Sequence, residues 1–279
     1  MEAKHLFLVI FVMICFGSVY PLGKLGTNNI PPILFSSLRV LIIFIGILPF
    51  FKIKLPSKKL ILPLLIFSIS MGIGVYVSLY IALDISSLVS PIIIGTQLTV
   101  PFGLILSFIF LNEKPDQKTL LAILITTLAV IYIFYDSFDR GDSFGNFFGL
   151  LAAMGLATGA VIIRSAKKIN LIPSAMVGKL LISLFAIIFV DNLVLKGNDL
   201  LIVPLMCVMC VAIPFVLITL APRYITAAEV NLFFLLETIL GPLWVWLVIK
   251  EQPSIETIVG GFIIIITITV HSILSLKKI

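Results

Sequence analysis

Ten long apolar runs dominate this sequence and restrict what it can fold into. A helix needs about 20 mostly apolar residues to cross a bilayer, with a range of about 17–25. Charged residues are only 11% of the chain, against about 25% in soluble domains. The sequence therefore predicts an all-α membrane protein with ten transmembrane helices and no room for a soluble catalytic domain. The runs are Leu6–Leu22, Pro32–Phe51, Leu60–Leu83, Leu88–Leu111, Thr119–Tyr135, Phe147–Ile163, Pro173–Leu195, Leu200–Leu220, Ala227–Ile249 and Ile255–Leu276.

Lysine and arginine placement predicts the orientation, because cytoplasmic loops carry an excess of both. With the N-terminus inside, the inner loops and tails hold 13 of these residues and the outer loops hold four. We therefore expect both termini to be cytoplasmic. The net charge of +6 then reflects topology, and no nucleic-acid partner is expected.

A charged phrase interrupts the apolar sequence twice. It reads "LNEKPDQKT" at 111–119 and "IKEQPSIET" at 249–257, with the shared Glu, Pro and Thr 138 positions apart. The phrase follows the fourth and the ninth run, so the chain divides into two units of five spans, 1–143 and 144–279. Because five is odd, the second unit enters the membrane from the opposite face. Such inverted repeats are typical of transporters that work by alternating access, and we expect both Glu residues to help end one helix and start the next.

The whole chain resembles the drug/metabolite transporter superfamily, in particular its ten-span EamA-like branch. The resemblance lies in "CFGSVYPLGKLGTNNIPPILFSSLRVL" at 15–41 and "SLVSPIIIGTQLTVPFGLILSFIFLNEKP" at 87–115, repeated more loosely at 148–168 and 227–253. One departure is Phe16, which stands before Gly17 where the family often has Trp. The resemblance implies efflux of a small organic metabolite across the cytoplasmic membrane, the bacterial inner membrane, with a central cavity between the two halves. The motifs specify the fold and not the solute.

Ionisable side chains inside the apolar runs are the sharpest functional signals, since a charge near the bilayer centre costs about 2.5–3.5 kcal/mol even on the mild insertion scale. Glu237 lies ten residues into its run, near the midplane, where a carboxyl group can exchange protons or pair with a cationic solute. In the repeat it overlies Gln97, and a proline follows each of them. We expect Glu237 and Gln97 to form two halves of one midplane site. The alternative is that Glu237 is a neutral hydrogen-bonding group between helices.

Arg39 and Lys179 are a second such pair, 140 positions apart. The sequence leaves open whether Arg39 binds an anion or packs and reaches the outer surface. For Lys179 it favours an ion pair with Glu229 over contact with solute. His271 is a weaker candidate for a role in transport.

Polar and aromatic side chains complete the candidate solute site. Tyr76 and Tyr80 are four residues apart and so share one helical face, on which a tyrosine stripe could bind an amphipathic solute. Interfacial belts also use tyrosine, so that alternative stays open. The full set of expected substrate-binding residues is Glu237, Gln97, Tyr76, Tyr80, Tyr20, Asn231 and Arg39.

No catalytic, cofactor or metal motif stands out. The sequence has no phosphate-binding loop and no paired histidines, and Cys207 and Cys210 are expected to pack inside a span. We therefore expect a non-enzyme that uses an ion gradient or the gradient of an amino-acid-like, amphipathic or cationic solute. Uptake by the same fold and flipping of a lipid carrier remain alternatives, a membrane-embedded enzyme is a more remote one, and monomer and homodimer are both open.

Overall fold

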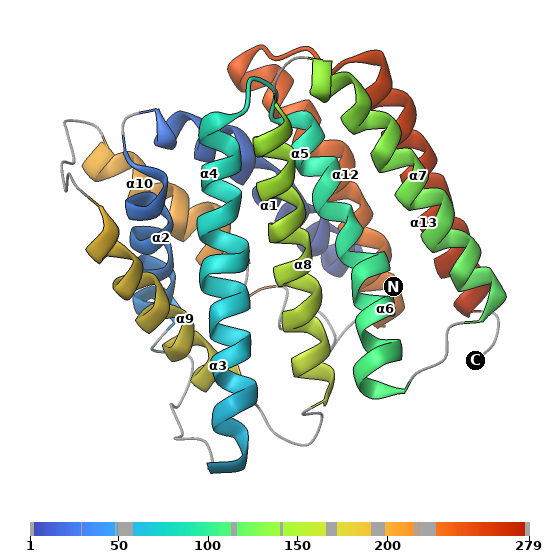
Figure 1. Ribbon diagram of the computed structural model, residues 1–279. Coiled ribbons are helices and arrows are strands. Elements are labelled where there is room, and N and C mark those ends of the chain that lie inside the picture. The colour runs from blue at the N-terminus through green and yellow to red at the C-terminus, as the bar shows by residue number, and fades with distance from the viewer. Residues whose placement is uncertain are drawn as a thin grey trace.

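The protein is a bundle of helices in a computed structural model (Figure 1). The structure describes residues 3–28, 30–47, 49, 58–112, 116–139, 142–165, 172–190, 199–214, 217 and 227–276. The first half contains α1 (Ala3–Thr27), α2 (Pro32–Ile47), η2 (Lys58–Leu60), α3 (Ile61–Ile69), η3 (Ser70–Val77), α4 (Ser78–Ile85), α5 (Ser90–Gly95), η4 (Thr96–Leu98), α6 (Thr99–Leu111) and α7 (Gln117–Asp139). The second half contains α8 (Ser143–Ser165), α9 (Ile172–Ala186), η5 (Ile187–Phe189), α10 (Asp199–Cys207), η6 (Val208–Ala212), α12 (Ala227–Ile249) and α13 (Ile255–Leu276).

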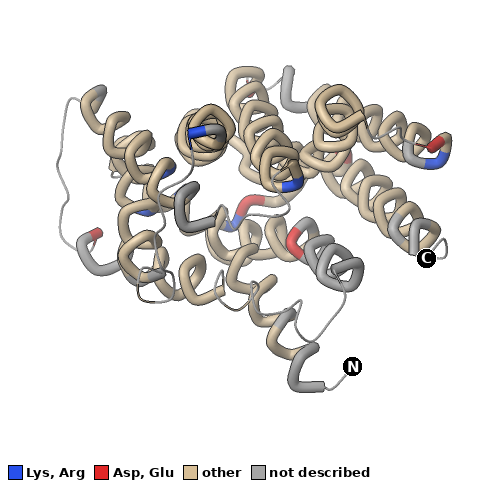
Figure 2. Tube along the Cα trace, turned by 90° about the horizontal axis from the view of Figure 1, so that it is seen from below, with Lys and Arg blue, Asp and Glu red and all other residues tan. Residues whose placement is uncertain are grey.

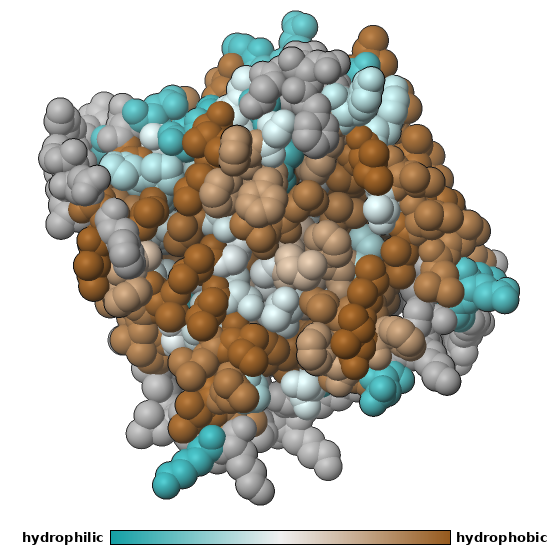
Figure 3. Space-filling model, viewed as in Figure 1, coloured by the Kyte–Doolittle hydropathy of each residue, from teal (hydrophilic) through white to brown (hydrophobic). Residues whose placement is uncertain are grey.

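The helices coincide with the apolar runs, so the prediction of an all-helical membrane protein is confirmed for the described residues. Four helical segments are long and apolar enough to cross a bilayer: Ile10–Thr27, Ile61–Ile85, Ser90–Leu111 and Ser143–Ser165. Five of the other six runs contain shorter apolar helices among the described residues, and the count of ten spans stays a prediction. Apolar side chains cover the middle of the molecular face in Figure 3, with hydrophilic ones toward its upper and lower ends. Such a band matches the cross-section of a bilayer.

Helices from the two halves of the chain pack against each other. α1 lies along α12, α7 lies along α13, and α8 packs against η3 and α4 (Figure 1). Because of these contacts, neither half of the chain forms a separate bundle. Viewed from below, few positions along the described helices are charged (Figure 2).

Gly155 allows one of these contacts to be unusually close. A Cβ atom at this position would lie 2.6 Å from the carbonyl oxygen of Ser70 and 2.9 Å from the backbone of Gly74. Only glycine can bring the backbones of α8 and η3 this near. The Gly155 and Gly159 pair thus serves helix packing, and Gly159 faces Met71 of η3.

Two π-helical segments lie at corresponding places in the two halves of the chain. η3 begins at Ser70 and η6 begins at Val208, a difference of 138 positions, as between the two copies of the charged phrase. π-helical turns are rare and often occur at functional sites. η3 carries Tyr76, one of the expected binding residues.

The 3₁₀ turn η4 has a local cause in Pro101. Proline has no N–H group, so it cannot donate to the carbonyl four residues earlier, which belongs to Gln97. The helix tightens at Thr96–Leu98 before it resumes as α6. Gln97 therefore lies at a break in the helix, as the sequence suggested.

Both copies of the charged phrase begin with the same backbone conformation. Asn112 ends α6 with a φ of 54°, and Lys250 follows α12 with a φ of 61°. These are the only non-glycine residues with positive φ in the described part of the chain. A left-handed residue is a common way to end a helix, and the phrase uses it at both of its positions.

Glu251 caps a helix in the other half of the chain. Its carboxylate accepts hydrogen bonds from the backbone N–H groups of Val89 (2.8 Å) and Ser90 (2.9 Å) and from the Ser90 hydroxyl (2.8 Å). A carboxylate at a helix N-terminus satisfies free N–H groups and interacts favourably with the helix dipole. The prediction that Glu251 helps to start the next helix was wrong, because Ser254 caps α13 through the N–H group of Thr257 (3.2 Å). Glu113, its counterpart, lies outside the described residues.

Further polar contacts tie together the same end of the bundle. The Lys24 ammonium group donates to the carbonyl oxygens of Ser86 (2.7 Å) and Asp84 (3.1 Å). Asp142 accepts from the N–H group (2.9 Å) and the hydroxyl (2.5 Å) of Ser87. The C-terminal ends of α1, α4 and α12 thus meet the N-terminal ends of α5 and α8, as a bundle of alternating spans requires.

Candidate functional site

Arg39 and Lys179 meet at one tyrosine inside the bundle. Both side chains are only 7% exposed. The guanidinium carbon of Arg39 lies 5.2 Å from the centroid of the Tyr76 ring, and the Lys179 ammonium nitrogen lies 5.4 Å from it. The ammonium group also donates a hydrogen bond to the Tyr76 hydroxyl (3.5 Å). The two repeat-related cations therefore share one aromatic partner.

Each cation has further aromatic neighbours. Arg39 donates a hydrogen bond to the Tyr80 hydroxyl and lies 5.4 Å from the centroid of that ring. Phe35 packs edge-on against Tyr80, with ring centroids 4.6 Å apart. Lys179 lies 5.4 Å from the centroid of Phe67. Cation–π contacts of this kind compensate part of the cost of burying a charge.

The ion pair expected between Lys179 and Glu229 stays a prediction. The sequence favoured an ion pair with Glu229, whereas the described contacts of Lys179 are with Tyr76 and Phe67. Glu229 lies in α12, but its side chain is outside what the structure describes. By contrast, the alternative in which Arg39 reaches the outer surface is wrong, because Arg39 is buried and bonded to Tyr80.

The helices that carry the two cations are held together next to them. The Ser37 hydroxyl on α2 donates to the carbonyl oxygen of Ser183 on α9 (2.5 Å). Both serines are fully buried. This contact fixes α2 beside α9 two residues before Arg39.

Glu237 and Tyr20 form the acidic side of the site. The Tyr20 hydroxyl on α1 donates to the Glu237 carboxylate on α12 (3.0 Å). Tyr20 is 8% exposed, and Glu237 is partly buried. Arg39 is near enough to interact electrostatically with both groups. The site thus combines the carboxyl group of Glu237 with the cationic side chains of Arg39 and Lys179, and these residues come from both halves of the chain.

Gln97 does not share a hydrogen bond with Glu237. The described hydrogen-bond partner of Glu237 is Tyr20, and Gln97 is half-buried in η4. Its neighbour Thr96 approaches the Tyr20 hydroxyl instead. Tyr20 therefore lies between Glu237 and the η4 turn that carries Gln97, and a shared midplane site of Gln97 and Glu237 stays a prediction.

Of the expected site residues, the structure brings together Arg39, Tyr76, Tyr80, Tyr20 and Glu237. Asn231 lies in α12, and its side chain is outside the described set. Phe35 and Phe67 belong to the aromatic lining but carry no sequence signal that separates them from the other 20 phenylalanines. Their role depends on the packing of α2 and α3.

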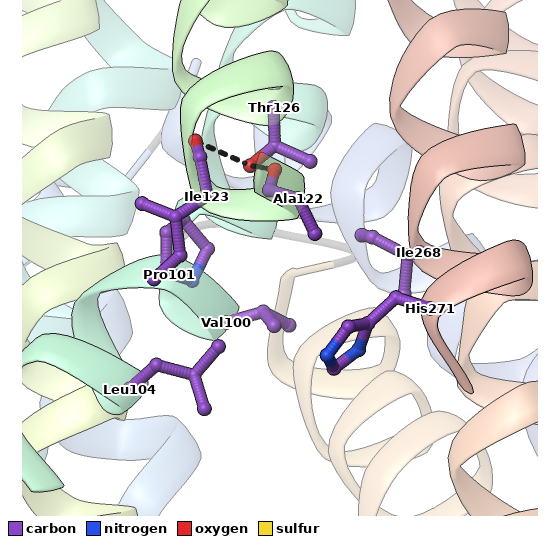
Figure 4. Close-up of a pocket in the computed structure, with 8 residues that line it drawn as sticks. All are labelled: Val100, Pro101, Leu104, Ala122, Ile123, Thr126, Ile268 and His271. Carbon is purple, nitrogen blue, oxygen red and sulfur yellow. Dashed lines mark hydrogen bonds between the residues drawn. The ribbon is translucent and has the colours of Figure 1, made fainter. Parts of the chain in front are cut away.

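His271 lies in a different place, in an apolar pocket between α6, α7 and α13 (Figure 4). Val100, Pro101 and Leu104 form one wall, and Ile268 lies beside the imidazole. The hydroxyl of Thr126 bonds to the carbonyl oxygens of Ala122 (2.8 Å) and Ile123 (3.1 Å). The pocket offers a solute little polar chemistry and is separate from the Glu237 site.

Sequence comparison identifies the family. The model of the EamA-like transporter family matches residues 3–135 and 143–273. The chain belongs to the EamA-like transporter family. This EamA-like protein is also similar to the uncharacterized transporter YoaV of Bacillus subtilis (strain 168), with 24% identity over 92% of each chain.

A solved structure has the same fold. A crystal structure described without a function covers 100% of this chain and 99% of its own, with a TM-score of 0.67 and 15% identity. Family and relative together point to a membrane transporter rather than an enzyme. Its environment is lipid, and its cargo is a small molecule.

Proposed function

We propose that this protein is a secondary transporter that moves a small organic metabolite across the cytoplasmic membrane by alternating access. Charged side chains inside the bundle, from both halves of the chain, carry the proposal: Arg39 is buried on α2, and Glu237 is partly buried on α12, where it accepts a hydrogen bond from Tyr20 of α1. Charged groups inside a membrane protein are costly and usually mark a solute or ion path. Transporters built from inverted repeats bind their solute near the midplane between the repeats.

The site favours a solute that carries charge. Glu237 can pair with a cationic group or exchange protons with the solvent, and the tyrosine rings suit a cationic or amphipathic body. Efflux is the direction we propose, with the gradient of the solute or of protons as the driving force. Uptake through the same site is the alternative for direction.

Flux in proteoliposomes tests this function. Vesicles that contain the purified protein are loaded with a mixture of amino acids and small amines, and solute release is compared with that from empty vesicles. A fluorescent phospholipid in the same vesicles reports lipid scrambling. Solute release without scrambling supports the proposal, and scrambling without solute release shows that the protein is a lipid flippase.

A further inference from the structure

Arg39 and Lys179 are two buried positive charges that form no hydrogen bond or ion pair with a carboxylate among the described residues, although Glu237 lies near enough to Arg39 to interact with it electrostatically. Each is 7% exposed, and the partners of both in the described part of the chain are aromatic rings and tyrosine hydroxyls. In addition, the Arg39 Nε–H group is buried and has no hydrogen-bond partner among the described residues. Neutral hydroxyls cannot offset the charge, and a buried charge is stabilised mainly by an opposite one.

The two cations approach the same point from opposite sides of the predicted membrane. Arg39 lies seven residues after the start of α2 and Lys179 lies seven residues after the start of α9. Seven residues of helix advance the chain by about 10 Å. In the predicted topology α2 starts at the outer face and α9 at the inner face, so both head groups reach Tyr76 at middle depth.

A bound anionic group with oxygen atoms would neutralise these two buried positive charges. Guanidinium groups bind carboxylate and phosphate oxygens through parallel hydrogen bonds, and an ammonium group adds a compact charge. The Tyr76 hydroxyl accepts a hydrogen bond from Lys179 and can donate its own proton to the same oxygens. A carboxylate or phosphate beside the Tyr76 ring would lie near cations from both halves of the chain.

We infer that Arg39, Tyr76 and Lys179 form a subsite for a carboxylate or phosphate group of the transported solute. The inference rests on the proposed transport function and names the chemical class of the solute. With Glu237 near Arg39, a solute that carries both an anionic and a cationic group would occupy both sides of the site. Amino-acid-like zwitterions have this chemistry.

Metabolite release from cells tests the subsite in the intact membrane. Cells that express the wild-type protein are compared with empty-vector cells by mass spectrometry of the medium. The metabolites released by the protein should share a carboxylate or phosphate group. Lys179→Gln should lower their release about tenfold or more, as expected for the loss of a charge-assisted hydrogen bond, while Lys179→Arg should keep most of it. Cells with Lys24→Gln, which removes a cation whose hydrogen bonds among the described residues go to backbone carbonyls, should release the metabolites as wild-type cells do.

Thermal stability of the purified protein gives an answer that does not depend on transport. Sodium acetate and sodium phosphate are compared with sodium chloride at equal ionic strength, because a bound anion raises the melting temperature by mass action. We expect acetate or phosphate to raise the melting temperature of the wild-type protein by more than it raises the melting temperature of Lys179→Gln or of Arg39→Gln. The variant Tyr76→Phe, which keeps the ring, should show a reduced shift. General salt effects on stability act on all variants equally.

The outcomes separate the two proposals. Release of purely cationic or uncharged solutes, unaffected by Lys179→Gln, overturns the subsite and leaves the transport function intact. Equal melting shifts in wild type and Lys179→Gln also overturn the subsite, as do no shifts at all. A Lys179-dependent shift without any solute release keeps the subsite and contradicts efflux. If Lys179→Gln changes nothing further in a protein that already carries Glu229→Gln, Lys179 belongs to a structural ion pair with Glu229 and the subsite is wrong.

Discussion

A carboxyl group can carry a proton or neutralise a cation, whereas an amide of the same shape can do neither. Glu237→Gln keeps an oxygen that accepts from the Tyr20 hydroxyl, so we expect the variant to fold and reach the membrane. It should lose the pH dependence of transport and lower the flux of cationic solutes about tenfold or more, from the loss of a charge-assisted contact. Glu237→Asp should keep part of the flux. Flux across a pH series in proteoliposomes measures both effects.

Tyr20→Phe is the matched control for that experiment, because it removes the hydrogen bond and leaves the carboxyl group in place. The two variants should differ: Tyr20→Phe should still respond to pH. If Glu237→Gln transports as the wild type does at every pH, Glu237 is a packing group and solute binds elsewhere.

At the same scale, residue type and depth predict which charged side chains lie inside the bundle, but not their partners. Arg39, Lys179 and Glu237 stand out because charge inside an apolar run is rare. The contact between Tyr20 and Glu237 joins positions 217 apart in sequence, and the meeting of Arg39 and Lys179 at Tyr76 needs three helices in place. Hydropathy and spacing carry no information about such contacts.

Helix ends and close helix contacts offer tests of stability that are separate from transport. Glu251→Gln removes the charge that caps the N-terminus of α5. Loss of a helix cap costs about 0.5–2 kcal/mol, and we expect a melting temperature a few degrees lower with unchanged solute selectivity. Glu256→Gln, the same change in the first turn of α13, should cost less. Selective loss of transport at full stability in Glu251→Gln would mean that the capping account is wrong.

Gly155→Ala tests the close approach of α8 and η3. The added methyl group would meet the Ser70 carbonyl oxygen at 2.6 Å, and overpacking of this kind costs about 1–3 kcal/mol. Gly103→Ala in α6 is the matched control, since nothing lies within 4 Å of a Cβ atom there. The control should melt at or above the wild-type temperature and Gly155→Ala clearly below it. Equal melting temperatures would show that the contact is looser than described.

The positions of the helices were more predictable from the sequence than the irregular segments within them. The apolar runs place the helices because a bilayer requires continuous apolar helix, and the left-handed residues Asn112 and Lys250 fall where the charged phrase begins. The π-helical segments η3 and η6 have no sequence signal that we can name. The cap that Glu251 provides to α5 depends on tertiary packing, so the repeat alone suggested the wrong helix.

For the whole molecule, the inverted repeat depends on the predicted orientation of the chain in the membrane. Lys58 and Lys167 should be cytoplasmic, and Asp139 and Gly197 should be external. Single cysteines at these positions, treated with a membrane-impermeant thiol reagent on intact cells, should label only at the last two. Labelling at Lys58 from outside would contradict the inverted arrangement of the two halves.

Counterflow tests the central claim of alternating access most directly. Vesicles with the wild-type protein are loaded with an unlabelled solute found in the release profile and diluted into a trace of the same solute in labelled form. A carrier that exposes one site to each side in turn should accumulate label transiently above its equilibrium level, and Glu237→Gln should weaken that overshoot. A simple approach of label to equilibrium, equally fast with and without unlabelled solute inside, would show a pore and contradict the mechanism.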